Sequence, residues 1–205
     1  MSYSIVSSPD LVAPGLHAET REDVLRAIAS LVADRSEAGR HSAEDVYERL
    51  LAREEQSSTG FGDGVAIPHC ALDGASAFLV GAVTTEEAVD YAAVDGQPVR
   101  LFFFIVGPGE ARTLHVRLLA SLSRLVRTVE ARERFENVQT AQALYDLVRA
   151  GTRLEEAKKE GPFSMINVFI QRQELFEDVL EILSSTSDGS VSVLELNSVG
   201  HYLNR

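Results

Sequence analysis

One run of residues, Val99 to Val106 (VRLFFFIV), limits the possible folds more than any other part of this 205-residue chain. It has the length of a strand and is apolar on both alternating faces apart from Arg100, as expected of a strand covered on each side. Residues 77–84 (AFLVGAVT) predict a second strand, and a turn at residues 95–98 (DGQP) lies between the two. A sheet covered on both faces needs two layers of helices, which predicts an α/β domain.

Four segments with helical periodicity can supply these layers. Thr20 and Ser42 each precede acidic residues and a repeating apolar pattern, so both are expected helix N-caps. The expected helices span residues 20–35, 42–56, 111–127 and 140–150.

Charge and cysteine content exclude several functions. The formal net charge is −12 and the pI is near 4.8, so nucleic-acid binding is not expected. The charge could attract a partner with a basic face, or it could serve solubility alone. Cys70 is the single cysteine, which indicates a reducing compartment. No apolar stretch approaches the roughly 18–20 residues of a membrane span and the N-terminus lacks the pattern of a signal peptide, so we expect a cytoplasmic protein.

A glycine-rich segment precedes the strongest candidate for chemistry, His69. Gly60, Gly62 and Gly64 are followed by the short apolar run 65–67 and by Pro68, which places His69 on or near a loop. An imidazole titrates near neutral pH and can act as a nucleophile, and backbone N–H groups beside glycines can bind an anion. The alternative is a loop histidine without a function.

Two further side chains could assist. His115 lies early in the expected helix 111–127, where an anion is favoured, although a buried structural histidine would fit the same apolar face. Arg53, at the end of the helix 42–56, could bind a phosphate with its forked guanidinium or could lie free in solvent.

Three segments resemble one known family, over roughly residues 10–150. They are AREEQSSTGFGDGVAIPHC, DGQPVRLFFFIVGP and LHVRLLASLSRLV. The resemblance is to the enzyme IIA proteins of the phosphoenolpyruvate-dependent sugar phosphotransferase system, of the fructose, mannitol and nitrogen-regulatory class. It implies a mixed β-sheet flanked by helices in a domain of residues 1–152, with neither a cofactor nor a metal ion.

The resemblance also implies roles for four residues. His69 matches the histidine that accepts a phosphoryl group on Nε2, and His115 matches a second histidine that steadies the phosphate. Arg53 matches an arginine that contributes positive charge, and Thr59 a threonine next to the site. Cys70 stands where the family often has glycine, so its side chain could narrow access or be oxidised.

Three functions agree with these residues. The favoured one is a regulatory phosphocarrier that is phosphorylated by a histidine-containing phosphocarrier protein and then acts on a target protein. The second is a sugar-transport component that passes the phosphoryl group to a IIB partner, and the third is a binding module without chemistry. A metal site at His69 and His115 lacks a third ligand with suitable spacing.

The C-terminal part has a different pattern. Residues 151–162 are polar and end in Gly-Pro, as in a linker. Residues 163–205 predict a strand, an amphipathic helix and a strand, which resembles the first β-α-β half of a ferredoxin-like domain of the P-II type. Half of such a domain has unpaired strand edges, so we expect two copies to pair in a homodimer. The alternative is that this unit docks on the first domain within one chain.

Overall fold

Two long antiparallel strands, β6 (Ala77–Val89) and β7 (Val99–Gly107), form the centre of the structure, a computed structural model that describes residues 3–33 and 35–152. β7 contains the expected apolar run, and its side chains alternate between two hydrophobic cores. One core receives Phe102, Phe104 and Val106, and the other receives Leu101, Phe103 and Ile105. All six are fully buried, so both faces of the sheet must be covered.

Five shorter strands complete a seven-stranded sheet in the described part of the chain, with the order β1-β6-β7-β4-β3. β1 (Ser4–Val6) and β2 (Val12–Leu16) both pair in parallel with β6. β4 (Val65–Ala66) and β5 (His69–Ala71) pair in parallel with β7, and β3 (Gly60–Gly62) pairs antiparallel with β4. The mixed sheet expected from the resemblance is confirmed.

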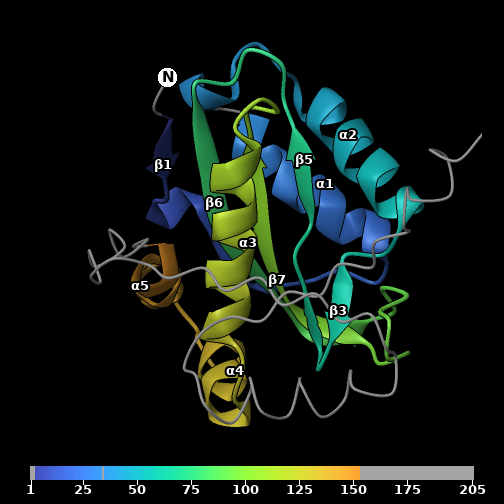
Figure 1. Ribbon diagram of the computed structural model, residues 1–205. Helices are drawn as coiled ribbons and strands as arrows, with labels where there is room; N and C mark the ends of the chain where they lie inside the picture. The colour runs from blue at the N-terminus through green and yellow to red at the C-terminus, as the bar shows by residue number, and fades with distance from the viewer. Residues whose placement is uncertain (1–2, 34, 153–205) are drawn as a thin grey trace, which may run out of the picture. The chain divides into compact units, whose positions relative to one another are not determined.

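Helices lie on both faces of this sheet (Figure 1). α1 (Arg21–Ala33) and α2 (Ala43–Gln56) cover one face. The other face is covered by α3 (Arg112–Leu125), α4 (Val129–Glu136) and α5 (Ala141–Thr152). Short 3-10 turns lie at Pro9–Leu11 and Ser36–Ala38. No helix in the described ranges is long and apolar enough to cross a membrane.

Side-chain caps explain where the first two helices begin. The Ser42 hydroxyl accepts a hydrogen bond from the Asp45 N–H, and the Asp45 carboxylate accepts one from the Ser42 N–H. Thr20 and Asp23 make the same reciprocal pair before α1. Both expected N-caps are therefore present, and each satisfies a backbone N–H group that the helix leaves unpaired.

Some elements differ from the sequence prediction. α4, β1 and β2 were not predicted, because each is short and has few buried side chains. α5 continues to Thr152, so it ends two residues inside the predicted linker. The rest of that linker and the predicted β-α-β unit, residues 163–205, lie outside the described residues, and the homodimer stays a prediction.

Two glycines allow a test of the packing beside β6. A Cβ atom added at Gly81 would overlap the Leu11 carbonyl oxygen, whereas one at Gly96 would meet nothing within 4 Å. Gly81→Ala should lower the free energy of unfolding by about 3 kcal/mol or more, because neither the backbone nor the core can move freely. Gly96→Ala should cost only about 1 kcal/mol, from strain at its positive φ. Urea denaturation measures both, and equal losses would contradict the packing described here.

Candidate functional site

His69 is the first residue of β5, and its position is set by the neighbouring strand β7. It lies in register with Ile105, whose N–H donates to the Pro68 carbonyl at 3.1 Å. The sequence predicted a residue on or near a loop, but the structure places His69 within the sheet. Pro68 interrupts the apolar run, and the two pieces, β4 and β5, pair with the same strand on either side of it.

The hydrogen bonds of the His69 imidazole determine which nitrogen carries the proton. Nδ1 lies 2.8 Å from the Ile67 carbonyl oxygen, and a carbonyl can only accept, so Nδ1 is protonated. Arg53 Nε lies 3.0 Å from Nε2, and a guanidinium can only donate, so Nε2 presents its lone pair. Burial lowers the pKa of His69, and the charge of Arg53 lowers it further. The imidazole is therefore neutral at physiological pH, with a nucleophilic Nε2.

Arg53 is held in the last turn of α2, with its guanidinium directed at His69. Its Nη1 also donates to the Ser57 carbonyl at 2.9 Å, directly after the helix. This second hydrogen bond fixes the orientation of the planar group. Arg53 thus belongs to the site and does not lie free in solvent.

His115 reaches the site from the opposite face of the sheet, on α3. Its ring is nearly perpendicular to that of His69, with 5.0 Å between the ring centres, and the Phe78 ring lies 6.0 Å away. Burial lowers the pKa of His115 to about 4, and the neighbouring His69 and Arg53 contribute to that shift. Its Nε2 is buried and has no hydrogen-bond partner in the described structure. The site thus contains a polar nitrogen that a ligand could engage.

Thr59 binds the buried carboxylate of Glu54, and in the described structure no hydrogen bond joins it to the His69 imidazole. Its N–H and its hydroxyl both donate to the Glu54 carboxylate, and the Tyr91 hydroxyl donates to the same group at 3.1 Å. Only 3% of Glu54 is exposed, so these three donors replace the water that a carboxylate needs. Glu54 was not predicted from the sequence, although its spacing from Tyr47 and Leu50 continues the buried stripe of α2.

A chain of hydrogen bonds links this buried carboxylate to His69. Glu54 holds the Thr59 N–H at 2.8 Å, and the Thr59 carbonyl accepts the Ile67 N–H at 3.0 Å. The Ile67 carbonyl then accepts the proton on His69 Nδ1. Glu54 therefore holds the segment from Thr59 to Ile67, whose last carbonyl selects the tautomer of the imidazole.

Cys70 points away from this site. It is buried in the core beneath α1 and α2, because consecutive side chains of a strand lie on opposite faces. Burial raises the pKa of its thiol to about 12, so almost no thiolate forms at neutral pH. Cys70 consequently neither narrows access to His69 nor has the reactivity of a redox-active cysteine.

The assembled site is suited to an anion. It combines two imidazoles that are neutral at physiological pH with one guanidinium, whose Nε–H lies at the lone pair of His69, and the ring centre of His115 lies 5.0 Å from that of His69. Among the residues that the structure describes, no three or more His, Cys, Asp or Glu side chains are grouped to hold a metal ion.

Comparison with known proteins identifies the family. The model of the family described as "Phosphoenolpyruvate-dependent sugar phosphotransferase system, EIIA 2" matches residues 6–151, and the chain belongs to this family. The nitrogen regulatory protein of Pseudomonas aeruginosa is 38% identical over 129 residues, which cover 63% of this chain and 82% of that protein. These similarities support a phosphocarrier regulatory protein of the nitrogen type.

Two solved structures show the same fold. The crystal structure of nitrogen regulatory protein IIA-Ntr from Neisseria meningitidis is 28% identical, with a TM-score of 0.64, and the match covers 69% of this chain and 94% of that one. Enzyme IIA mannitol of Escherichia coli, solved in complex with phosphorylated enzyme IIB mannitol, is 17% identical with a TM-score of 0.60. That match covers 71% of this chain and 99% of the other.

The role of the buried carboxylate can be tested with two adjacent glutamates of α2. Glu54→Ala should lower the free energy of unfolding by about 3 kcal/mol or more, because it leaves three buried donors without an acceptor. The control, Glu55→Ala, removes an exposed side chain from the same helix and should change it by no more than about 0.5 kcal/mol. Thermal or urea denaturation of both variants measures the difference, and equal stabilities would refute the network.

The low pKa of His115 predicts a dependence of stability on pH. Between the usual histidine pKa of about 6.5 and the value of about 4 in the folded chain, the unfolded chain binds a proton that the folded chain does not. The free energy of unfolding should therefore fall as the pH drops through this window. His115→Gln should make that fall shallower. Urea titrations at several pH values measure the slope, and a wild-type slope in His115→Gln would contradict the assignment.

Proposed function

We propose that the chain accepts a phosphoryl group on His69 Nε2 from a histidine-containing phosphocarrier protein, and that the phosphorylated state acts as a regulatory signal of the nitrogen type. One observation carries the proposal. The Nδ1 proton of His69 is held by the Ile67 carbonyl, which leaves the Nε2 lone pair in the site beside Arg53 and His115. The nitrogen regulatory relatives support the regulatory part of the proposal.

The proposed step needs no proton transfer. The lone pair of His69 Nε2 attacks the phosphorus of the donor's phosphohistidine, and a new N–P bond forms. The N–P bond of the donor breaks, and its electron pair stays on the donor's imidazole nitrogen. His69 keeps its Nδ1 proton on the Ile67 carbonyl throughout. Catalysis then consists of placing the two imidazoles in line and neutralising the phosphoryl oxygens.

Arg53 and His115 are proposed to neutralise these oxygens. In the free chain the Arg53 Nε–H caps the lone pair of His69, so it must move to a phosphoryl oxygen as the attack begins. A phosphoryl group on Nε2 would also give the unpartnered Nε2 of His115 an oxygen to bind. Thr59 is proposed to keep the Ile67 carbonyl in place through its bonds to Glu54.

A second function, delivery of the phosphoryl group to a sugar-specific IIB partner, is favoured by one comparison. The E. coli enzyme IIA mannitol, which shares this fold, was solved with phosphorylated enzyme IIB mannitol. Both functions use the same phosphohistidine and differ only in the protein that receives or senses the group. Incubation of the phosphorylated chain with a IIB component separates them, since only a transport component should lose its label rapidly.

Phosphotransfer from phosphoenolpyruvate through enzyme I and the phosphocarrier protein tests the proposed site. The full chain should gain an acid-labile phosphoryl group on His69, and His69→Ala should gain none. His115→Ala and Arg53→Ala should fold but transfer about tenfold to a thousandfold more slowly, as expected when electrostatic stabilisation of the transition state is lost. The control His17→Ala should transfer at the normal rate. Stable labelling of His69→Ala would overturn the proposal.

A further inference from the structure

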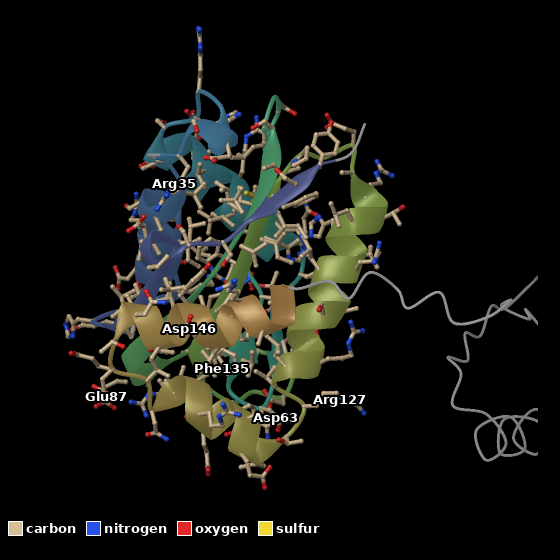
Figure 2. The ribbon with its side chains drawn as sticks, turned by 90° about the vertical axis from the view of Figure 1, so that its left-hand side faces the viewer. Arg35, Asp63, Glu87, Arg127, Phe135 and Asp146 are labelled. Carbon is tan, nitrogen blue, oxygen red and sulfur yellow. The ribbon has the colours of Figure 1, made fainter. Side chains whose placement is uncertain are left out.

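The outer face of α3 is basic, although the protein as a whole is acidic. The chain has 31 acidic and 19 basic residues, yet no Asp or Glu occurs between Ala111 and Val129. Four arginines of this segment are exposed, and they are called the arginine stripe here: Arg112, Arg117, Arg124 and Arg127. Figure 2 shows nitrogen-tipped side chains along the outer side of α3, with Arg127 at the end of the row.

The arginines of the stripe have no partners within the described part of the chain. None of their side chains forms a hydrogen bond or an ion pair there, whereas other arginines, such as Arg26, Arg35 and Arg49, are paired with carboxylates. Arg112, Arg117 and Arg124 on α3 and Arg127 just after it carry like charges that repel each other, which costs stability. Intramolecular contacts do not explain the stripe, so its charge is available to a second molecule.

The stripe is placed to act on the phosphotransfer site. Arg112 lies one helical turn before His115, and the arginines of the helix itself, from Arg112 to Arg124, extend along roughly 18 Å of α3, at 1.5 Å per residue. A typical protein interface covers about 800 Å² on each partner, which is wide enough to include both the site and the stripe. Val116, of which 63% is exposed, provides an apolar contact between the arginines.

We propose that the arginine stripe of α3 docks an acidic face on the protein that delivers the phosphoryl group to His69. This inference rests on the proposed function. A donor must bring its own phosphohistidine to Nε2 of His69, and α3 carries the second histidine of that site. Complementary charge accelerates such encounters and excludes partners whose facing surface is basic.

A protein is favoured over a nucleic acid as the occupant. A nucleic acid extends well beyond one helix, and α2, which contributes Arg53 to the same site from the other face of the sheet, has an acidic exposed side with Glu44, Asp45, Glu48 and Glu55. These carboxylates would repel a phosphate backbone. A protein can instead confine its acidic residues to the area that faces α3.

The same charges favour release of the donor after transfer. The phosphoryl group on His69 places new negative charge beside the N-terminal end of α3, and the donor loses an equal charge. The phosphorylated chain should therefore attract an acidic surface less strongly than the free chain does. Docking is thus tightest before transfer, when it is needed.

Charge reversal at the stripe tests the proposal, with the full chain and the phosphorylated histidine phosphocarrier of the same organism as the donor. Arg117→Glu and the double variant R117E/R124E are compared with Arg40→Glu, which reverses an exposed, unpaired arginine before α2. At low ionic strength kcat/KM should fall at least about tenfold in the double variant, mainly through KM, and change less than about twofold in Arg40→Glu. In the wild type kcat/KM should fall as salt is added, and this dependence should weaken in the double variant.

Phosphorylation by the small donor phosphoramidate checks that His69 remains reactive in each variant, because this reaction needs no protein contact. If the wild type accepts phosphate from neither donor, the proposed function fails. If the wild type accepts it from the protein donor and charge reversal leaves kcat/KM unchanged or raises it, only the docking proposal is overturned. If a DNA duplex competes with the protein donor for binding to the arginine stripe, the docking proposal is also overturned.

Discussion

The hydrogen bond from His69 Nδ1 to the Ile67 carbonyl is the interaction on which the rest of the site depends. It places the proton on one nitrogen and leaves the other free to react. Several distant parts of the chain cooperate to hold that carbonyl. β7 aligns both sides of Pro68, and the buried Glu54 on α2 fixes Thr59, which binds the Ile67 N–H. The long apolar strand and the buried carboxylate thus serve the same purpose, which is to keep one proton in place.

The resting site contains features that do not stabilise the folded chain. Two imidazoles are buried enough to have lowered pKa values, and the charge of Arg53 lies next to both. A buried polar atom without a partner, such as Nε2 of His115, costs about 1–3 kcal/mol when no ligand engages it. An anion on His69 would balance the charge of the guanidinium. The site is therefore suited to a bound anion, and the two large cores of the sheet supply the stability that it lacks.

Periodicity and turn chemistry were sufficient to predict the long elements. β7, α1, α2, α3 and α5 were expected near their observed ends because each has a continuous buried face. α4 escaped detection because Phe135 is its one buried residue, and its start depends on a cap at Thr128. His69 was expected on a loop because Pro68 normally ends a strand, and only the pairing of β5 with β7 shows that the strand resumes. That pairing joins residues far apart in sequence, so no local pattern could predict it.

The candidate site was predictable in its residue types, but not in its supporting groups or its surroundings. Resemblance to the family pointed to His69, His115 and Arg53. Glu54 was not predicted, because the sequence alone does not show which groups donate hydrogen bonds to it, and without them a buried glutamate on a helix looks the same as a solvated one. Net charge misleads in a similar way. The value of −12 is a sum over the whole chain, whereas a docking partner responds to charges within about one Debye length, roughly 8 Å at physiological salt. Over that distance the outer face of α3 presents unpaired arginines, whereas the outer face of α2 presents carboxylates. The same acidic protein can therefore attract an acidic partner at α3 and repel that partner at α2.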